Sequence, residues 1–434
     1  MIALALAVLG LSGPATDTLR LGPGVHAGPL VLARRTVVLG APGAVLQGDG
    51  HGTVLVVRAR GSVVRGLTIT GSGRDPDHYD AGIRVEADSV TLEDLVLRDV
   101  LFGVYLQQVR DVQVRRLDIL GAALGREGDR GDGISLYNSR GVLAEDNRIA
   151  WMRDGIYFSY SDSAVVRGNR VSHVRFGLHY MFSHENRFER NVFTDNAAGA
   201  VIMNSRHVTV TGNVFAWNAG SRSYGLLLQT ATAPTIEGNS FVGNGVGVFF
   251  DNVIRGRFRD NLVASNWLGL ELFANSESTT VSGNAIVGNT FDAAGGAAAG
   301  AYRLCEDGRG NYWGAAALSG YDLDGDGTFD APYAVSAPLA ELALTHDNLR
   351  PLLDSPAAHA LAWAERTFPV FASAGAVDSC PLARAPQIAA LGALPAAPAA
   401  RLGGTGPQQA AGVLLLLAGG AVLAGFRGRR GKAA

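Results

Sequence analysis

The sequence predicts an all-β protein: a right-handed, single-stranded parallel β-helix with about 22 residues per coil and a small C-terminal cap. Asparagines in equivalent contexts, such as DNRI and GNRV, follow one another at spacings of 22, 22, 22, 26, 22 and 23 residues. A column of glycines and a second, shorter column of asparagines follow the same spacing through its single insertion of four residues. Because three columns share one insertion, the repeat is a structural unit of the fold. The columns are Asn147, Asn169, Asn191, Asn213, Asn239, Asn261 and Asn284; Gly133, Gly155, Gly177, Gly199, Gly225, Gly247 and Gly269; and Asn196, Asn218, Asn244, Asn266 and Asn289.

The local pattern within each repeat indicates short strands rather than helices. The period is too short for paired helices, and stretches such as GIYF at 155–158 alternate between polar and aliphatic or aromatic residues. One coil of a parallel β-helix takes about this many residues, and successive coils stack roughly 4.8 Å apart. Asn tolerates left-handed backbone in turns, and stacked Asn amides can hydrogen-bond along the axis. We therefore expect the β-helix to occupy residues 16–300.

One spacing in the glycine column departs from the repeat and predicts a loop. The step from Gly103 to Gly133 is 30 residues long, and residues 121–131 have the sequence GAALGREGDRG. An insertion of this kind leaves the solenoid as a loop, and such loops often line the binding face.

The N-terminus predicts a signal peptide over residues 1–15. Residues 2–11 are apolar and are followed by Ser12-Gly13-Pro14-Ala15, which resembles a cleavage region, although the basic residues that usually precede the apolar run are missing. The alternative is that this segment is a buried first strand.

Beyond the repeat, the sequence divides into four segments. Residues 301–385 are expected to cap the open end of the β-helix, and residues 386–409, rich in Ala, Pro and Gly, form a linker. Residues 410–426 are an uncharged run that predicts a transmembrane segment or a sorting signal that is later removed. The basic tail at 427–434 would place this end in the cytoplasm and the body outside, anchored to the membrane.

Composition excludes some classes of function. The net charge is -2, hydrophobic residues make up 47% and charged residues only 18%, so neither a disordered protein nor a nucleic-acid binder fits. Lys432 is the only lysine, so the body of the protein has no lysine base.

The two cysteines, Cys305 and Cys380, both follow the repeats. One disulfide that closes the segment between them is the preferred interpretation, since the pair lacks the close spacing of a zinc knuckle or a redox CxxC motif. Two unrelated buried thiols are the alternative.

Counting by 22 within the repeat predicts a surface strip with metal-binding chemistry. Two columns, which start at Ile134 and Leu136, are apolar and must face inward, so the intervening columns face outward. This places His179, Met181 and Met203 together on the surface, with His184 on the turn just after. Thioether and imidazole ligands suit Cu(I), and the chain has only four methionines. The alternatives are that the 121–131 loop covers the strip, or that the strip is a hydrophobic surface for a partner.

A second candidate metal site is the acidic run DLDGDGTFD. Its carboxylates at alternate positions, with a Gly for the sharp turn, resemble a calcium loop, although the bidentate Glu of an EF-hand is absent. A structural calcium site in the cap and a plain solvated turn both remain open. The candidate ligands are Asp322, Asp324, Asp326 and Asp330.

Catalysis is not expected from the outward columns. Parallel β-helices often bind or cleave polysaccharide, and hydrolysis needs two carboxylates that face each other across the sugar. Asp132 and Asp154 are stacked, but both stand next to the column glycine, where shaping the turn is the simpler role. Asp251 and Glu271 lie further along, and no strip gathers acids, Arg and His together. A carbohydrate-binding or carbohydrate-cleaving protein is kept as the alternative, and a surface adhesin anchored by its tail as a third hypothesis.

Several stretches resemble the NosD family, the periplasmic accessory proteins of nitrous-oxide reductase maturation. They are GDGISLYNS (131–139), RDGIYFSYSD (153–162), RFGLHYMFSHENRFERN (175–191), NYW (311–313) and SGYDLDGDGTFDAPY (319–333). The resemblance spans most of residues 20–355, and the HYMFSHEN segment and the ordered cap are its specific parts.

The resemblance implies a non-enzymatic, periplasmic role. NosD proteins work with an ABC-type ATPase and a membrane permease in assembly of the copper-sulfur centre of nitrous-oxide reductase, so the expected partners include that reductase or a copper chaperone. No ligand assignment comes from the family: the proposal of copper at His179, Met181, His184 and Met203 rests on face counting alone.

Overall fold

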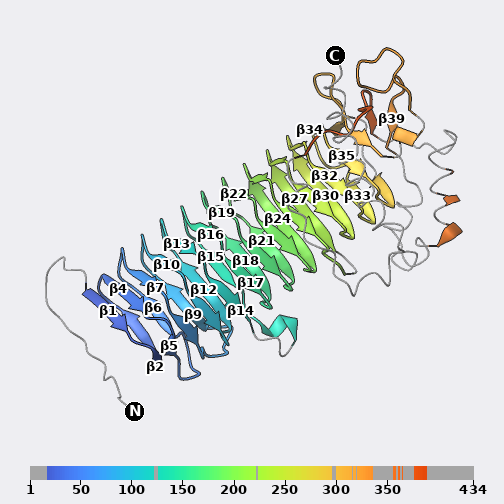
Figure 1. Ribbon diagram of the computed structural model, residues 1–434. Helices are drawn as coiled ribbons and strands as arrows, with labels where there is room; N and C mark the ends of the chain where they lie inside the picture. Colours follow the sequence, from blue (N-terminus) through green and yellow to red (C-terminus); the bar gives the residue numbers. More distant parts are fainter. Residues whose placement is uncertain are drawn as a thin grey trace, which may run out of the picture.

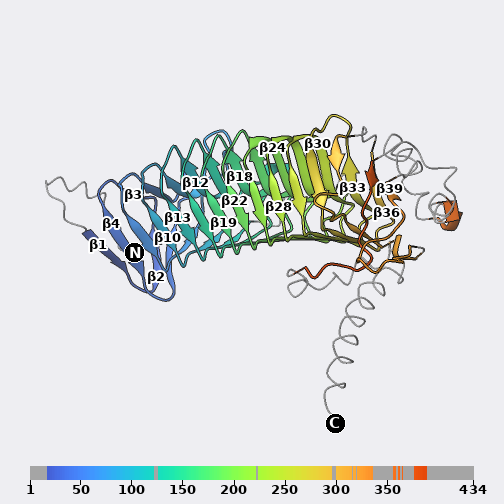
Figure 2. The same cartoon turned by 90° about the horizontal axis from the view of Figure 1, so that it is seen from above.

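The computed structural model is a long stack of coils whose regular elements are almost all β-strands (Figure 1). It describes residues 17–121, 126–220, 223–295, 300–314, 316–318, 320–335, 355–357, 360–361, 364 and 376–388. Seen from above, the first strands lie at one end of the stack and the cap strand β39 (Tyr333–Ala334) at the other (Figure 2). The all-β parallel solenoid predicted from the repeat is confirmed.

Three parallel sheets run along the axis, and each coil contributes one strand to each sheet. Sheet 1 contains β1 (Asp17–Leu21), β4 (Thr36–Gly40), β7 (Val63–Arg65), β10 (Thr91–Glu93), β13 (Gln113–Arg115), β16 (Leu143–Glu145), β19 (Val165–Arg167), β22 (Arg187–Glu189), β25 (Thr209–Thr211), β28 (Thr235–Glu237), β31 (Arg257–Arg259), β34 (Thr279–Ser282) and β37 (Tyr302–Arg303). Sheet 2 contains β2 (Gly24–Ala27), β5 (Ala44–Gln47), β8 (Thr68–Thr70), β11 (Val96–Arg98), β14 (Asp118–Leu120), β17 (Arg148–Ala150), β20 (Arg170–Ser172), β23 (Val192–Thr194), β26 (Val214–Ala216), β29 (Ser240–Val242), β32 (Leu262–Ala264), β35 (Ala285–Val287) and β38 (Tyr312–Trp313). Sheet 3 contains β3 (Leu30–Leu32), β6 (Leu55–Val57), β9 (Ala81–Val85), β12 (Phe102–Gln107), β15 (Ile134–Tyr137), β18 (Asp154–Ser159), β21 (Phe176–Met181), β24 (Ala198–Arg206), β27 (Tyr224–Thr232), β30 (Val246–Ile254), β33 (Leu268–Leu272) and β36 (Phe291–Ala294).

The interior is filled by the inward columns of the three sheets. Ile156, Leu178 and Ala200 are register partners on β18, β21 and β24, and each is at most 1% exposed. The glycine column lies where coils approach closely: a Cβ on Gly177 would stand 2.5 Å from the carbonyl oxygen of Gly199. The side chain is therefore excluded at this column by backbone packing and not by a need for unusual dihedral angles.

The first asparagine column forms a buried ladder along the axis. The side chain of Asn191 accepts from the backbone N–H of Asn169 at 3.0 Å, and its own Nδ2 donates to Oδ1 of Asn213 at 2.9 Å. The same amide also donates to the carbonyl of Val166 at 2.8 Å. Each amide thus satisfies backbone groups of the turn that cannot join a sheet, which explains why the column is buried yet polar.

The solenoid continues beyond the predicted boundary at residue 300. Strands β37 and β38 pair with β34 and β35, and Asn311 accepts from Asn284 at 2.8 Å as the next rung of the ladder. The 27-residue step from Asn284 to Asn311 hides this rung from a 22-residue count.

The C-terminal cap closes the ladder with a buried carboxylate. Asp378, on β40 (Val377–Asp378), accepts from the backbone N–H of Asn311 at 2.8 Å and from the indole N–H of Trp313 at 2.9 Å. Strand β40 pairs antiparallel with β39, and Cys305 is joined to Cys380 by a disulfide with a Cα–Cα distance of 5.7 Å. Two short 3₁₀ turns complete the described elements, η1 (Glu127–Asp129) in the 121–131 loop and η2 (Ala316–Leu318) in the cap.

The expected terminal segments lie outside the described residues. These are the signal peptide at 1–15, most of the linker at 386–409, the apolar run at 410–426 and the basic tail at 427–434. Among the residues that are described, no helix has the length and apolar character needed to cross a bilayer.

Candidate functional site

The outer face of sheet 3 carries the methionine pair, Met181 and Met203. Met181 on β21 is the register partner of Met203 on β24, and both side chains are partly exposed. His179, two residues before Met181, has Tyr157 and Val201 as its partners and faces the same side. Neighbouring strands of a sheet are about 4.8 Å apart, so two thioethers and one imidazole lie on adjoining positions of one surface.

His179 is held by a buried carboxylate. Its Nδ1 lies 2.8 Å from Oδ2 of Asp154, a residue that is 0% exposed. Arg175 binds the same carboxylate at two points, with Nε 2.9 Å from Oδ1 and Nη2 2.6 Å from Oδ2. Burial alone would raise the pKa of Asp154, but the hydrogen bonds from His179 and Arg175 outweigh burial and lower that pKa below its ordinary value.

The ionised carboxylate fixes the tautomer of His179. An ionised carboxylate can only accept, so Nδ1 carries a proton, and whenever the ring is neutral Nε2 presents its lone pair. The ring is also packed edge-on against Tyr157 and Phe176, with centroid distances of 5.0 and 5.1 Å, and its side chain is 13% exposed. The imidazole therefore has one oriented nitrogen and one nitrogen available to a ligand.

His184 lies in a different column from the methionine pair. The chain turns at Phe182, whose φ is 49°, and His184 then forms an isolated bridge with Arg206 of the next coil. Its backbone N–H donates to Asp162 at 2.7 Å, and its buried Nδ1 has no hydrogen-bond partner in the described part of the chain. The structure thus brings together three of the four proposed copper residues on one strand face and places the fourth beyond the turn.

The role of Asp132 and Asp154 was missed from the sequence. Asp132 binds Arg153 at 3.1 and 3.2 Å, and Asp154 binds Arg175, one coil further on, in the same bidentate arrangement. Both carboxylates are buried ion-pair partners and not only turn formers. The available signal was the repeated 21-residue offset from each Asp to its Arg, in the segments GDG, RDG and RFG.

Beside the methionine pair, an aromatic stack stands at the corner of the coil. Tyr160 and Phe182 are 55% and 41% exposed, and their rings stack with centroids 5.3 Å apart. Both have positive φ, at turn positions that Asn138, Asn204 and Asn252 occupy in other coils. The corner is therefore apolar and exposed where most coils are polar.

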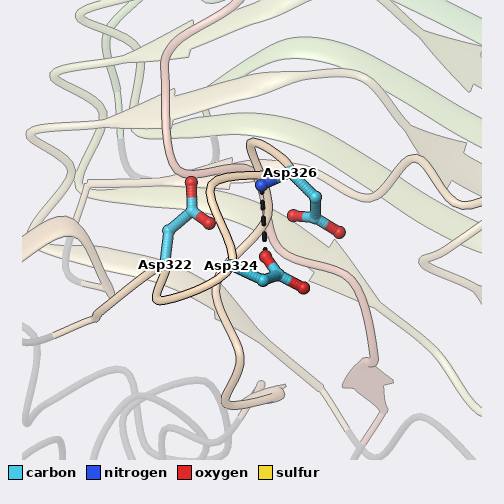
Figure 3. Close-up of side chains that lie close together, drawn as sticks. All are labelled: Asp322, Asp324 and Asp326. Carbon is cyan, nitrogen blue, oxygen red and sulfur yellow. Dashed lines mark hydrogen bonds between the residues drawn. The ribbon is translucent and has the colours of Figure 1, made fainter.

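The acidic loop of the cap gathers three of its four predicted ligands (Figure 3). One carboxylate oxygen from each of Asp322, Asp324 and Asp326 lies within 4.8 Å of the others. Asp330 is not in this group, and its carboxylate instead accepts from the backbone N–H of Leu323 at 2.8 Å. Hydrogen bonds from Thr328 lower the pKa of Asp326 below its ordinary value, so this carboxylate stays ionised.

Comparison with known proteins identifies relatives over most of the chain. Residues 110–318 match the family model described as "Periplasmic copper-binding protein (NosD)". The chain is 36% identical over 382 residues to the "Probable ABC transporter binding protein NosD" of Pseudomonas aeruginosa, covering 84% of this chain and 88% of that protein. The protein of the same name from Stutzerimonas stutzeri is 35% identical over 385 residues, covering 85% and 87%. These names describe binding proteins and no enzyme, in line with the expectation from the sequence.

Among solved structures, a similar one is the A-module of the Azotobacter vinelandii mannuronan C-5 epimerase AlgE4. It is 15% identical, its TM-score is 0.48, and the alignment covers 67% of this chain and 91% of that chain. At this level of similarity it contributes nothing to the functional argument.

Proposed function

This chain belongs to the NosD family, and from that premise we propose that it is an extracytoplasmic accessory factor for assembly of the copper-sulfur centre of nitrous-oxide reductase. In this role it carries Cu(I) as cargo on the outer face of sheet 3 and works with an ABC-type ATPase and permease. The name of the family model refers to periplasmic copper binding, and the names of both relatives refer to an ABC transporter.

The observation that carries the proposal is the methionine pair beside His179. Met181 and Met203 offer two soft sulfur donors on adjacent strands, and Nε2 of His179 offers a nitrogen donor on the same face. Thioether and imidazole donors favour Cu(I) over calcium or magnesium, and the absence of thiolate suits a cargo that must be released. When bound, copper would be held by these three side chains, with His184 as a fourth ligand only if its side chain reaches across the turn.

The test is Cu(I) binding by the full chain with Met181 and Met203 both changed to Leu. We expect the affinity, measured by competition with a coloured Cu(I) chelator, to fall at least about 100-fold, since two of three ligands are lost. The control is Met152→Leu, because Met152 is 1% exposed in the core and should leave copper binding unchanged. Wild-type affinity in the double variant, together with normal copper content of the reductase in cells that carry it, would refute the copper site.

We propose that the protein forms a complex with the permease and the ATPase. We expect the chain to co-purify with the permease and ATPase when the three are expressed together, whether or not the C-terminal apolar run at 410–426 is present. Loss of the complex only on removal of that run would show that the tail, and not the solenoid, makes the contact.

For the cap we propose a structural Ca²⁺ held by Asp322, Asp324 and Asp326, whose carboxylates already converge. Ca²⁺ at 1 mM should raise the melting temperature of the cap relative to protein in EDTA. An Asp324→Asn variant should lose most of this difference. An equal melting temperature with and without Ca²⁺ would leave the loop as a solvated turn.

A further inference from the structure

We propose that Asp154 and Arg175 are positioning residues that hold His179 as a copper ligand, with its Nδ1–H bound inward and its Nε2 free at the surface. The inference rests on the proposed copper function, because it concerns the same face of sheet 3. It assigns a role to a buried carboxylate that Arg175 and His179 bind together.

The first step is the direction in which His179 is held. Asp154 and His179 lie on adjacent strands, β18 and β21, and the contact of 2.8 Å engages Nδ1 and leaves Nε2. Metal-binding histidines characteristically donate their other ring N–H to a carboxylate or a carbonyl, which fixes the tautomer and increases the basicity of the ligating nitrogen. Because His179 and Met181 are two residues apart on one strand, the free nitrogen and the Met181 thioether face the same side.

The second step is the state of Asp154. A buried carboxylate is costly unless it is paired and hydrogen-bonded, and Arg175 supplies two of its hydrogen bonds. Arg175 is itself held over the Phe176 ring, with its guanidinium carbon 4.5 Å from the ring centroid. Arg175 therefore holds the carboxylate in place, and the carboxylate orients the imidazole.

The third step is a comparison that the repeat itself provides. One coil earlier, Asp132 and Arg153 form the same bidentate pair, but Asp132 accepts its further hydrogen bond from the hydroxyl of Ser135 at 3.1 Å. The residue in register with His179 on that coil is Tyr157, which is not a ligand for Cu(I). If the two Asp–Arg pairs served only to shape their turns, changes at Asp132 and Asp154 should have the same effect. Only Asp154 also binds a histidine, so an effect on copper binding is expected for Asp154 alone.

The experiment compares Asp154→Asn with the matched control Asp132→Asn in the full chain. In copper-free protein, the ¹⁵N shifts of the His179 ring should report a single Nδ1–H tautomer in the wild type and in D132N, and a mixture of tautomers in D154N. With Cu(I) and a competing chelator, D154N should lower the affinity about 10- to 100-fold, as loss of such supporting groups does elsewhere, while D132N should change it less than about twofold.

Two further variants keep the result interpretable. Asp154→Asn combined with Arg175→Gln removes both charges together, which avoids an Arg175 guanidinium that has lost the Asp154 carboxylate if D154N alone does not fold. In a His179→Leu background, D154N should have no additional effect on Cu(I) affinity, because its action passes through the imidazole.

The outcomes separate this inference from the proposed function. If His179→Leu and the methionine double variant weaken Cu(I) binding while D154N keeps both the tautomer and the affinity of the wild type, Asp154 does not position His179, and the copper site stands. An equal loss of affinity in D154N and D132N would overturn the inference as well, since it would show a general effect on the fold. If the ligand variants themselves bind Cu(I) like the wild type, the copper site fails, and the inference fails with it.

Discussion

The outer faces of sheet 1 and sheet 3 are built on the same backbone but use charge in opposite ways. On sheet 1, register partners alternate in sign along the axis, and ion pairs such as Arg115–Glu93 and Arg167–Glu145, at 3.2 and 2.5 Å, join neighbouring coils. The alternating row comprises Arg65, Glu93, Arg115, Glu145, Arg167 and Glu189. On sheet 3, the charged groups Asp132 and Asp154 are buried and the outward positions carry tyrosine, histidine and methionine.

The difference between the two faces shows how a repetitive fold can carry a binding site on one sheet only. On sheet 1, arginines and glutamates of neighbouring strands neutralise one another, as Glu93 does with Arg65 and Arg115. On sheet 3, Asp132 and Asp154 lie beneath the surface, and Asp154 supports the His179 side chain above it. A solenoid can thus keep its stability on one face and place binding chemistry on another, because each coil contributes one strand to each face.

The largest expected effect is on the free energy of unfolding, when one carboxylate is removed from an ion pair on each face. Asp154→Ala should lower the free energy of unfolding by about 3 kcal/mol, because it strips the buried partner from Arg175 and His179. Glu145→Ala should lower it by less than about 1 kcal/mol, since the Arg167–Glu145 pair is 37% and 20% exposed and water screens it. Urea unfolding of both variants checks the contrast, and similar losses would mean that the two faces do not differ in this respect.

A smaller effect on the free energy of unfolding is expected when the pH changes, and its sign is opposite for Asp132 on sheet 3 and Glu93 on sheet 1. Burial, reinforced by the nearby Asp154, raises the pKa of Asp132 to about 6. The folded state therefore binds this proton more tightly than the unfolded chain, and the resulting stabilisation, present at low pH, is lost as pH rises through about 6. For Glu93, burial would raise the pKa, but hydrogen bonds from Arg116 and Arg65 outweigh it and lower the pKa, so its stabilisation is lost as the solution becomes strongly acidic.

Two variants isolate these contributions. Between pH 7 and pH 5, the stability of the wild type should rise relative to Asp132→Asn, on the order of 1 kcal/mol. Below pH 5, the wild type should lose stability relative to Glu93→Gln. Thermal unfolding across the pH range measures both differences, and parallel curves for wild type and D132N would contradict the raised pKa of Asp132.

The smallest expected effect concerns the exposed aromatic stack. Replacing Tyr160 and Phe182 by Asn should leave the free energy of unfolding unchanged or raise it by up to about 1 kcal/mol, because Asn tolerates the positive φ of this turn. The reverse change, Asn204→Phe, should lower it by a similar amount. A marked drop in melting temperature for the Asn variants would show that the stack supports the fold, rather than being a surface feature of the site.

Counting by 22 was enough to find the methionine pair and His179, since these residues are related by register alone. The count failed where side chains reach across the repeat. The contacts of Asp154 with Arg175 and His179 join residues at unequal places in successive coils, whereas His184 lies past the turn at Phe182, on the side of the turn where the count had put it. The repeated 21-residue offset marks the Asp–Arg pairs, but it does not show that the Asp154 carboxylate also reaches His179.

The sequence by itself determined the solenoid, its period and the face on which Met181 and Met203 stand, because a periodic backbone converts spacing directly into position. Only the tertiary structure decided which nitrogen of His179 is engaged, that Asp154 is completely buried, and that three of the four acidic side chains in the cap converge. These depend on distances between side chains of different coils or on the exact path of a loop, and the pattern of residues along the chain does not encode such distances.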